Sequence, residues 1–188
     1  MKHKIAVFAS GSGSNFEAIC SAAEQEDIPG EVALMVCDKP SAKVCERARK
    51  YNVPSFVFSA KDYDSKAEYE QRIVEECRKR GVELICLAGY MRLVGSTILD
   101  AYRGRIINLH PSLLPLYKGA RAIEQAFENG DRHYGATIHY VDESLDGGEI
   151  ISQQSLCYEG NSLEEVTEMI HQLEHKLYTE TIKTLLSK

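Results

Sequence analysis

The chain has 188 residues, of which 44% are hydrophobic and 27% charged, so we expect one globular domain whose core needs no disulfide or metal. Its formal net charge is −6 and it has no Lys- or Arg-rich block, which argues against nucleic acid as the main partner. No apolar stretch approaches the roughly 20 residues of a membrane span, which argues against a membrane protein.

Strand-like and helix-like segments alternate through the first part of the chain. Apolar and β-branched runs predict strands at Lys4–Ser10, Glu31–Cys37, Ser55–Phe58, Val82–Ala88 and Arg105–Leu109. We predict helices at Asn15–Gln25, at Ser41–Tyr51 with Ser41 as N-cap, and from Asp64 or Ser65 to Arg80, where Gly81 ends the helix. Because Val82–Ala88 is the most apolar strand, we expect it to be central and buried on both faces.

The second part of the chain begins with an apolar loop, Gly89–Val94. A helix is predicted at Arg121–Asn129, and Gly135–Val141 and Glu149–Cys157 resemble a pair of longer strands around a loop. Ser162 begins a final amphipathic helix with a capping box. The alternation predicts an α/β fold: a doubly wound, mostly parallel sheet in a single domain, residues 1–188, with the strand carboxyl ends at one edge.

A Gly/Ser turn, Gly11-Ser12-Gly13-Ser14-Asn15, separates the first strand from the first helix. Small residues before a helix N-terminus can hold a phosphate on free N–H groups. The alternative is a tight turn that Ser14 or Asn15 caps. A dinucleotide fingerprint is half present, since Phe16 stands where GxGxxG needs its last glycine, although Asp38 could bind a ribose. A monophosphate therefore suits the loop better than a pyrophosphate.

Asn108 and His110 end the strand Arg105–Leu109 and lie two residues apart, so they share a face if the strand is still extended there. An amide N–H can stabilise a carbonyl oxygen that gains charge in acyl transfer, and a histidine can move a proton near neutral pH. Asp146, beside two glycines, could orient His110 and favour its cationic form.

Each of these residues also has a structural interpretation. A histidine at a strand end is often only hydrogen-bonded in place, but Pro111 and Pro115 restrict the backbone around His110 and favour a fixed, functional ring. Asp146 in an Asp-Gly-Gly sequence would also suit a turn. A site in which the three side chains converge remains the preferred hypothesis.

Six cysteines form no CxxC pair and have no histidine at zinc-ligand spacing, so we expect no metal and free thiols in a reducing cytoplasm. A cysteine nucleophile is a minor alternative. The remaining histidines, His133, His139, His171 and His175, form no metal-ligand pattern, and we expect surface or core roles for them. Lys118 and Arg121 could bind an anion or lie at the surface.

At these residues the chain resembles the folate-dependent formyltransferases. The matching segments are spread over almost the whole chain: Ser10–Asn15, Leu87–Arg92, Asn108–Pro115 with Tyr117 and Gly119, and Leu145–Ile150. The Asn-x-His-Pro-Ser-Leu-Leu-Pro segment is specific to the superfamily. The Gly-Ser-Gly-Ser-Asn loop indicates the branch that formylates glycinamide ribonucleotide in purine biosynthesis, with a Rossmann-like fold.

The resemblance implies a role for each candidate residue. Gly13, Ser14 and Asn15 would hold the ribonucleotide phosphate, with help from Lys66, and Glu174 would receive the substrate amine. The folate pocket would be lined by Met91, Arg92, Leu93, Val94, Val141 and Asp142. The N-terminal half would thus bind the ribonucleotide, and the C-terminal half would bind folate and carry out catalysis.

The implied reaction is direct transfer from 10-formyltetrahydrofolate to the amine, without a metal or a covalent enzyme intermediate. Asn108 and protonated His110 would stabilise the oxyanion, and Asp146 would keep His110 cationic and assist the proton transfer. The Lys118–Arg121 loop departs from relatives that have a histidine there. The oligomeric state is open, a homodimer being one option.

Several other functions remain open from the sequence. Methionyl-tRNA formyltransferases and formyltetrahydrofolate deformylases carry an extra domain, for which we expect no room in 188 residues. Sugar-nucleotide formyltransferases are not excluded by length. Outside the family, a small NAD-binding oxidoreductase would use the Gly11/Gly13 turn and Asp38, and a cofactor-binding module without catalysis is a third option.

Overall fold

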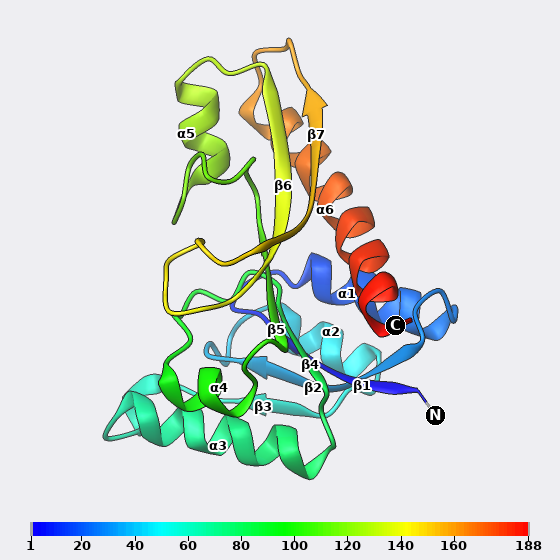
Figure 1. Cartoon of the computed structure of the whole chain (residues 1–188), viewed down its shortest axis with the longest axis vertical. Coiled ribbons are helices and arrows are strands. Elements are labelled where there is room, and N and C mark those ends of the chain that lie inside the picture. Colours follow the sequence, from blue (N-terminus) through cyan, green and yellow to red (C-terminus); the bar gives the residue numbers. More distant parts are fainter. Residues whose placement is uncertain (1, 188) are drawn as a thin grey trace.

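The computed structural model describes residues 2–187 and arranges seven strands in one sheet (Figure 1). The strands are β1 (His3–Phe8), β2 (Gly30–Cys37), β3 (Ser55–Val57), β4 (Leu84–Leu87), β5 (Ile106–His110), β6 (His133–Tyr140) and β7 (Ile150–Cys157). Their order is β3-β2-β1-β4-β5-β6-β7. The first five in this order run parallel, whereas β6 is antiparallel to β5 and β7 is antiparallel to β6. The predicted mostly parallel sheet is confirmed.

Helices cover both faces of the sheet. They are α1 (Ser14–Glu24), α2 (Val44–Lys50), α3 (Lys66–Lys79), α4 (Ser96–Ala101), α5 (Ala122–Glu128) and α6 (Leu163–Leu186). One buried cluster joins α1, α2 and α6 to the strands, and a second joins α3 and α4 to the opposite face. The burial of apolar side chains on both faces, β4 included, is what a doubly wound sheet requires.

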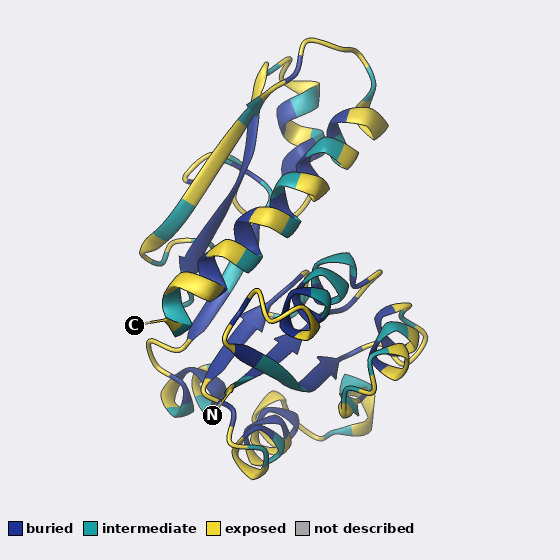
Figure 2. Cartoon of the chain, turned by 90° about the vertical axis from the view of Figure 1, so that its right-hand side faces the viewer, coloured by how far each residue is buried: buried dark blue, intermediate teal, exposed yellow. Residues whose placement is uncertain are grey.

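The strands β6 and β7 extend well beyond the parallel strands as a long hairpin, and α6 runs beside it (Figure 1). Figure 2 shows that α6 turns its buried side toward these strands. Near its C-terminal end, Tyr178 is fully buried and its hydroxyl donates to Leu87 O over 2.9 Å and to Ile107 O over 3.3 Å. Tyr178 thereby connects α6 to β4 and β5. Its contact on β5 is Ile107, the residue before Asn108.

The N-caps predicted at Ser65 and Ser162 agree with the structure, and the one predicted at Ser41 does not. Ser65 and Ser162 accept hydrogen bonds from Glu68 N and Glu165 N, as capping serines should. The predicted N-cap at Ser41 is wrong, because α2 begins only at Val44, whose N–H donates to Gly11 O in the loop after β1. A contact between distant segments therefore decides where this helix starts.

The helix α4 and the short 3-10 turn Ala60–Asp62 have no counterpart in the prediction. The helix α4 has no polar N-cap, since Gly95 occupies that position. Instead, Glu70 of α3 accepts a hydrogen bond from Gly95 N over 2.7 Å. This distant carboxylate replaces the local capping signal. No helix within residues 2–187 is both long and apolar enough to cross a membrane.

Candidate active site

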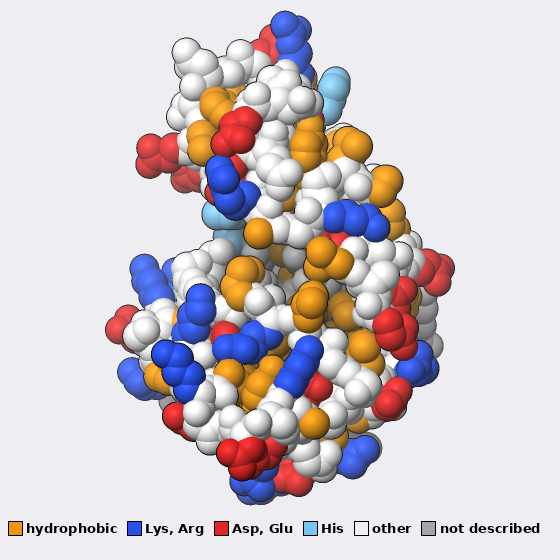
Figure 3. Space-filling model, turned by 90° about the vertical axis from the view of Figure 1, so that its left-hand side faces the viewer, with side chains coloured by type: hydrophobic (Ala, Val, Ile, Leu, Met, Phe, Trp, Pro, Cys, Tyr) orange, Lys and Arg blue, Asp and Glu red, His pale blue; other side chains and the backbone are white. Residues whose placement is uncertain are grey.

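A cavity of about 900 Å³ opens at the carboxyl edge of the parallel strands. The loops after β1, β4 and β5, the β6–β7 loop and one side of α6 form its walls. Figure 3 shows this face of the molecule hollowed between its lower and upper parts, with hydrophobic side chains around the hollow. Open α/β sheets bind ligands in this position, so the cavity is the candidate active site.

The structure brings Asn108, His110 and Asp146 together in this cavity. Asn108 and His110 lie on β5, and Asp146 lies in the β6–β7 loop. Asp146 Oδ2 is 3.5 Å from His110 Nδ1, and Asn108 Nδ2 donates to Asp146 Oδ1 over 3.4 Å. The side chains of His110 and Asp146 are only 6% and 10% exposed, so water screens their interaction little. The three side chains therefore form one connected polar group.

Both ring nitrogens of His110 face oxygen atoms that accept hydrogen bonds. Nε2 lies 2.8 Å from Tyr117 O, and Nδ1 faces the Asp146 carboxylate. A neutral imidazole could donate to only one of these oxygens, whereas an imidazolium donates to both. Tyr117 presents its carbonyl from a left-handed backbone conformation (φ +52°), and its hydroxyl donates to Asp131 Oδ2 over 2.7 Å. Each ring nitrogen of His110 therefore has an acceptor oxygen beside it.

Asp146 is held in its ionised form. Burial by itself would favour the neutral acid, but the nearby His139 ring, the hydrogen bond from Gly119 N–H and nearby His110 keep the pKa of Asp146 below its ordinary value. Gly119 N donates over 2.8 Å. Asp146 also adopts φ +46°, a conformation that Asp tolerates better than most residues. Asp146 therefore lies in a turn and also interacts with His110, which are the two roles predicted from the sequence as alternatives.

His139 also belongs to this site, which corrects our expectation of a surface or core role. It lies on β6 opposite Asn108 in the antiparallel register, and it is 2% exposed. Its Nδ1 donates to Tyr140 O over 2.8 Å, and its Nε2 is 3.1 Å from Asn108 Nδ2 and 3.7 Å from Asp146 Oδ1. The Asn108 amide is therefore oriented by His139 and Asp146 together, and a substrate oxygen would compete with them for its N–H groups.

The loop Gly11–Asn15 lines another wall of the cavity. Gly13 is the N-cap of α1, in a left-handed conformation (φ +75°), and no side chain caps the helix. The alternative in which Ser14 or Asn15 caps α1 is therefore wrong. A Cβ on Gly13 would lie 2.5 Å from Val44 Cγ2, so glycine is needed here for space as well as for conformation. The uncapped helix start leaves N–H groups for an anion.

Glu174 of α6 borders the same loop and lines the cavity. Its side chain accepts a hydrogen bond from Asn15 Nδ2 over 3.1 Å, and the residue is only 5% exposed. Burial raises the pKa of Glu174 to about 7, although the bond from Asn15 opposes this shift. The carboxyl group can therefore gain or lose a proton near neutral pH.

The segment Met91–Val94 forms the apolar wall, where Met91 and Leu93 are 68% and 66% exposed. Its backbone is nevertheless fixed, because Met91 N donates to Ser10 Oγ over 2.9 Å. Ser10 Oγ in turn donates to Asp38 Oδ1, and Arg92 Nε donates to Asp38 Oδ2 over 2.8 Å. A held backbone with exposed apolar side chains suits the binding of a flat ring system.

Val141 and Asp142 contribute to the opposite wall. Val141 N donates to Ile106 O over 3.0 Å, which holds this wall against β5. Asp142 Oδ1 accepts from Ser144 N over 2.8 Å, and the hydroxyl and N–H of Ser144 lower the pKa of Asp142. The start of the β6–β7 loop is thereby ordered before it reaches Asp146.

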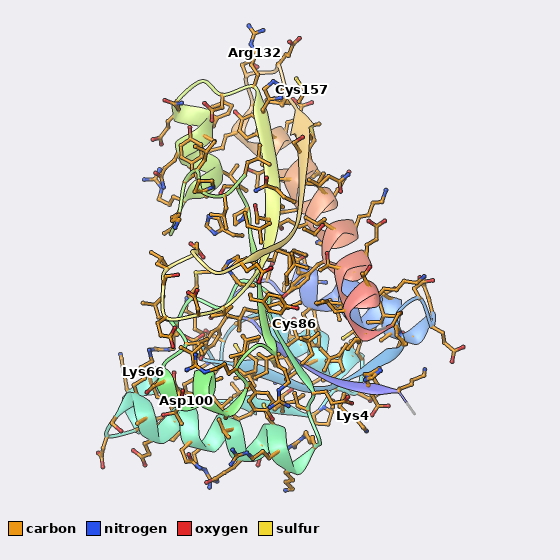
Figure 4. All side chains as sticks on the ribbon, viewed as in Figure 1. Lys4, Lys66, Cys86, Asp100, Arg132 and Cys157 are labelled. Atoms are coloured by element: carbon orange, nitrogen blue, oxygen red, sulfur yellow. The ribbon has the colours of Figure 1, made fainter. Side chains whose placement is uncertain are left out.

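Lys66 begins α3 and also borders the cavity (Figure 4). Its Nζ lies 3.9 Å from Glu70 Oε1, and Gly95 N donates to the same carboxylate. Lys66 is therefore placed beside the end of the Met91–Val94 segment. Its help in binding a phosphate at Gly13–Asn15 stays a prediction.

Two alternative functions need residues that are not free to act in the cavity. An NAD-binding oxidoreductase would need Asp38, and covalent catalysis would need a cysteine. Asp38 is 7% exposed and already bound to Ser10 and Arg92, so it offers no free carboxylate to a ribose. None of the six cysteines, all of which lie within residues 2–187, lines the cavity. Burial raises the pKa of three buried thiols to about 12: Cys20, Cys37 and Cys77. Figure 4 shows Cys86 in the middle of the sheet and Cys157 at the far end of β7.

Comparison with known proteins agrees with this geometry. The formyl transferase family model matches residues 3–182. The chain is 54% identical to phosphoribosylglycinamide formyltransferase of Bacillus subtilis (strain 168) over 97% of this chain and 94% of that protein. It is 36% identical to the Haemophilus influenzae enzyme of the same name, over 96% and 85% of the two chains.

A solved structure gives the same result. The crystal structure of glycinamide ribonucleotide transformylase 1 from Geobacillus kaustophilus matches with a TM-score of 0.96 and 52% identity, over 99% of this chain and 100% of that chain. The resemblance noted from the motifs is confirmed, and the chain belongs to the formyl transferase family.

Proposed function

We propose that this protein transfers the formyl group of 10-formyltetrahydrofolate to the amine of glycinamide ribonucleotide, a step of purine biosynthesis. One observation carries the proposal: the uncapped start of α1 and the Asn108–His110–Asp146 group line the same cavity. A small phosphorylated amine could therefore be bound through its phosphate and react within the same cavity. The names of the relatives that match almost the whole length of the chain support this substrate.

In this proposal the ribonucleotide binds along the wall formed by α1 and α6. The backbone N–H groups of Gly13, Ser14 and Asn15 hold its phosphate, aided by the helix dipole. Glu174 receives the amine, and its position next to Asn15 keeps it close to the phosphate loop. The N-terminal half of the chain thus supplies the phosphate site, while the C-terminal half supplies Glu174 and the reacting groups.

The formyl folate binds against the apolar wall. Met91, Leu93 and Val94 offer exposed apolar surface to its ring, and Arg92, through Asp38, keeps this segment in place. Val141 and Asp142 close the opposite side. A cavity of about 900 Å³ is large enough for a drug-sized ligand together with a small second substrate.

The side chains near β5 then assist acyl transfer. As the amine forms its bond to the formyl carbon, the formyl oxygen gains negative charge, which Asn108 stabilises by a hydrogen bond and protonated His110 by its positive charge. Asp146 keeps His110 protonated and, through water, assists transfer of the proton from the attacking amine to the folate nitrogen that leaves. The proposed transfer is direct and requires no enzyme nucleophile, and the cysteines lie outside the cavity.

The proposal is tested by mixing the protein with glycinamide ribonucleotide and 10-formyltetrahydrofolate and following the folate product by absorbance. We expect saturable turnover with both substrates. A parallel reaction with an amino-sugar nucleotide as acceptor should give none, and turnover there alone would identify a sugar-nucleotide formyltransferase. Saturable NAD(H) binding without any formyl transfer would overturn the proposal. The six thiols, none in a disulfide, are compatible with the cytoplasm that we propose as its location.

A further inference from the structure

The phosphate loop is held from behind by α2. Val44 N donates to Gly11 O over 3.1 Å, and Arg47 Nε donates to Ser12 O over 2.8 Å. Two consecutive carbonyl groups of the loop are therefore bound to two residues of one helix. The residues Gly11–Asn15 line the cavity, whereas no residue of α2 does. The loop thus separates α2 from the cavity.

These contacts decide where the next N–H groups point. In a trans peptide the C=O of one residue and the N–H of the next are directed to opposite sides. Because the carbonyls of Gly11 and Ser12 face α2, the N–H groups of Ser12 and Gly13 face the cavity. Neither N–H donates a hydrogen bond to any group in residues 2–187. The contacts with α2 thus direct the N–H of Gly13, one of the proposed phosphate donors, and the neighbouring N–H of Ser12 toward the cavity.

Arg47 is itself fixed in this position. Its Nη1 forms an ion pair with Glu17 in the first turn of α1, and Lys50 Nζ bonds the same carboxylate over 2.9 Å. The side chains of Arg47 and Glu17 are 20% and 28% exposed, whereas that of Lys50 is 67% exposed. Because Glu17 compensates the charge of Arg47, the contribution of Arg47 is mainly geometric. The planar guanidinium reaches a carbonyl and a carboxylate at once, which a lysine ammonium cannot match.

We propose that Arg47 is a positioning residue for the substrate phosphate: through Ser12 O it presets the N–H groups of the loop Gly11–Asn15. This inference rests on the proposed function and adds a residue that has no contact of its own with the substrate. It predicts that loss of Arg47 weakens recognition of the phosphate while the reaction at His110 and Asp146 continues.

The main test compares Arg47→Met, Arg47→Lys and the control Lys50→Met. The control also removes one positive charge that pairs with the Glu17 carboxylate, but Lys50 does not contact the loop. We expect Arg47→Met to raise KM for glycinamide ribonucleotide about tenfold, as the loss of a charge-assisted hydrogen bond would, with kcat changed less than about twofold. Arg47→Lys should also raise KM, by several-fold or more. Lys50→Met should behave like the wild type.

A substrate without the phosphate separates positioning from a general structural effect. With glycinamide riboside, kcat/KM should be low in the wild type and unchanged in Arg47→Met. Equal losses for the riboside and the ribonucleotide would mean that Arg47 only stabilises the fold. Full activity of Arg47→Lys, or a defect in Lys50→Met equal to that of Arg47→Met, would mean that only the charge matters. Either result would overturn the proposal.

A binding measurement tests Arg47 independently of turnover. In ¹⁵N-labelled wild-type protein, inorganic phosphate should shift the amide resonances of Ser12 and Gly13, and in Arg47→Met it should do so only at about tenfold higher concentration. Equal titrations in the two proteins would refute the role of Arg47. Absence of formyl transfer by the wild type would instead refute the proposed function, so the two failures are distinguishable.

Discussion

Replacing Asp146 by Asn tests whether the carboxylate maintains the charge of His110. The substitution keeps the size of the side chain but removes its charge 3.5 Å from His110 Nδ1. At this distance the attraction between a carboxylate and an imidazolium is about 5 kcal/mol for an effective dielectric constant of 20. Loss of little more than half of it from the transition state, about 2.7 kcal/mol, lowers kcat about 10²-fold. We therefore expect a decrease of at least this size.

The assay is steady-state folate release at saturating concentrations of both substrates, with circular dichroism to verify that the variant is folded. Glu149→Gln is the matched control, because it removes one negative charge from an exposed residue at the end of the same loop and outside the cavity. It should keep kcat within about twofold of the wild type. A folded Asp146→Asn protein with kcat within about threefold of the wild type would refute this role of the carboxylate.

Three further substitutions probe other parts of the cavity. Gly13→Ala places a methyl group against Val44 in a left-handed conformation, so it should lower Tm by several degrees and raise KM for the ribonucleotide; unchanged values of both would refute the need for glycine. The pKa of Glu174 is raised in the folded protein, which therefore loses stability as pH rises from about 4.5 through about 7. Glu174→Gln should then be more stable than the wild type in urea at pH 8 and show no such advantage at pH 4.5, while it weakens ribonucleotide binding; an equal stability change at both pH values would contradict this. Asp38→Asn weakens the contact with Arg92 and should raise KM for the formyl folate several-fold with little change in KM for the ribonucleotide; equal changes in both would indicate a general loss of structure.

Local signals were sufficient for the parts of the fold that depend on neighbouring residues. Ser65 and Ser162 cap their helices through bonds to residues three positions later, which a sequence pattern can show. The apolar run before Gly89 likewise forms a buried central strand. Asn108 and His110 could be recognised because both lie at the end of one strand, where a ligand site of an α/β sheet is expected.

Contacts between distant segments explain the errors. The N-cap at Ser41 was wrong because α2 starts where Val44 meets Gly11 O. The helix α4 was missed because Glu70, 25 residues before Gly95, supplies the contact at its start. His139 could not be assigned from spacing, since it reaches the site only through its antiparallel pairing with Asn108. Its alternation with apolar neighbours on β6 was compatible with a core role and gave no sign of its partner.

The account depends most on the claim that the formyl group moves to the ribonucleotide amine and nowhere else. The direct measurement is ¹³C NMR of a reaction that contains 10-formyltetrahydrofolate labelled at the formyl carbon, glycinamide ribonucleotide and the wild-type protein. We predict that the label appears as the N-formyl signal of formylglycinamide ribonucleotide, and that little of it appears as formate. Label that stays on the folate, or that is released as formate whether or not the ribonucleotide is present, would contradict the proposed function.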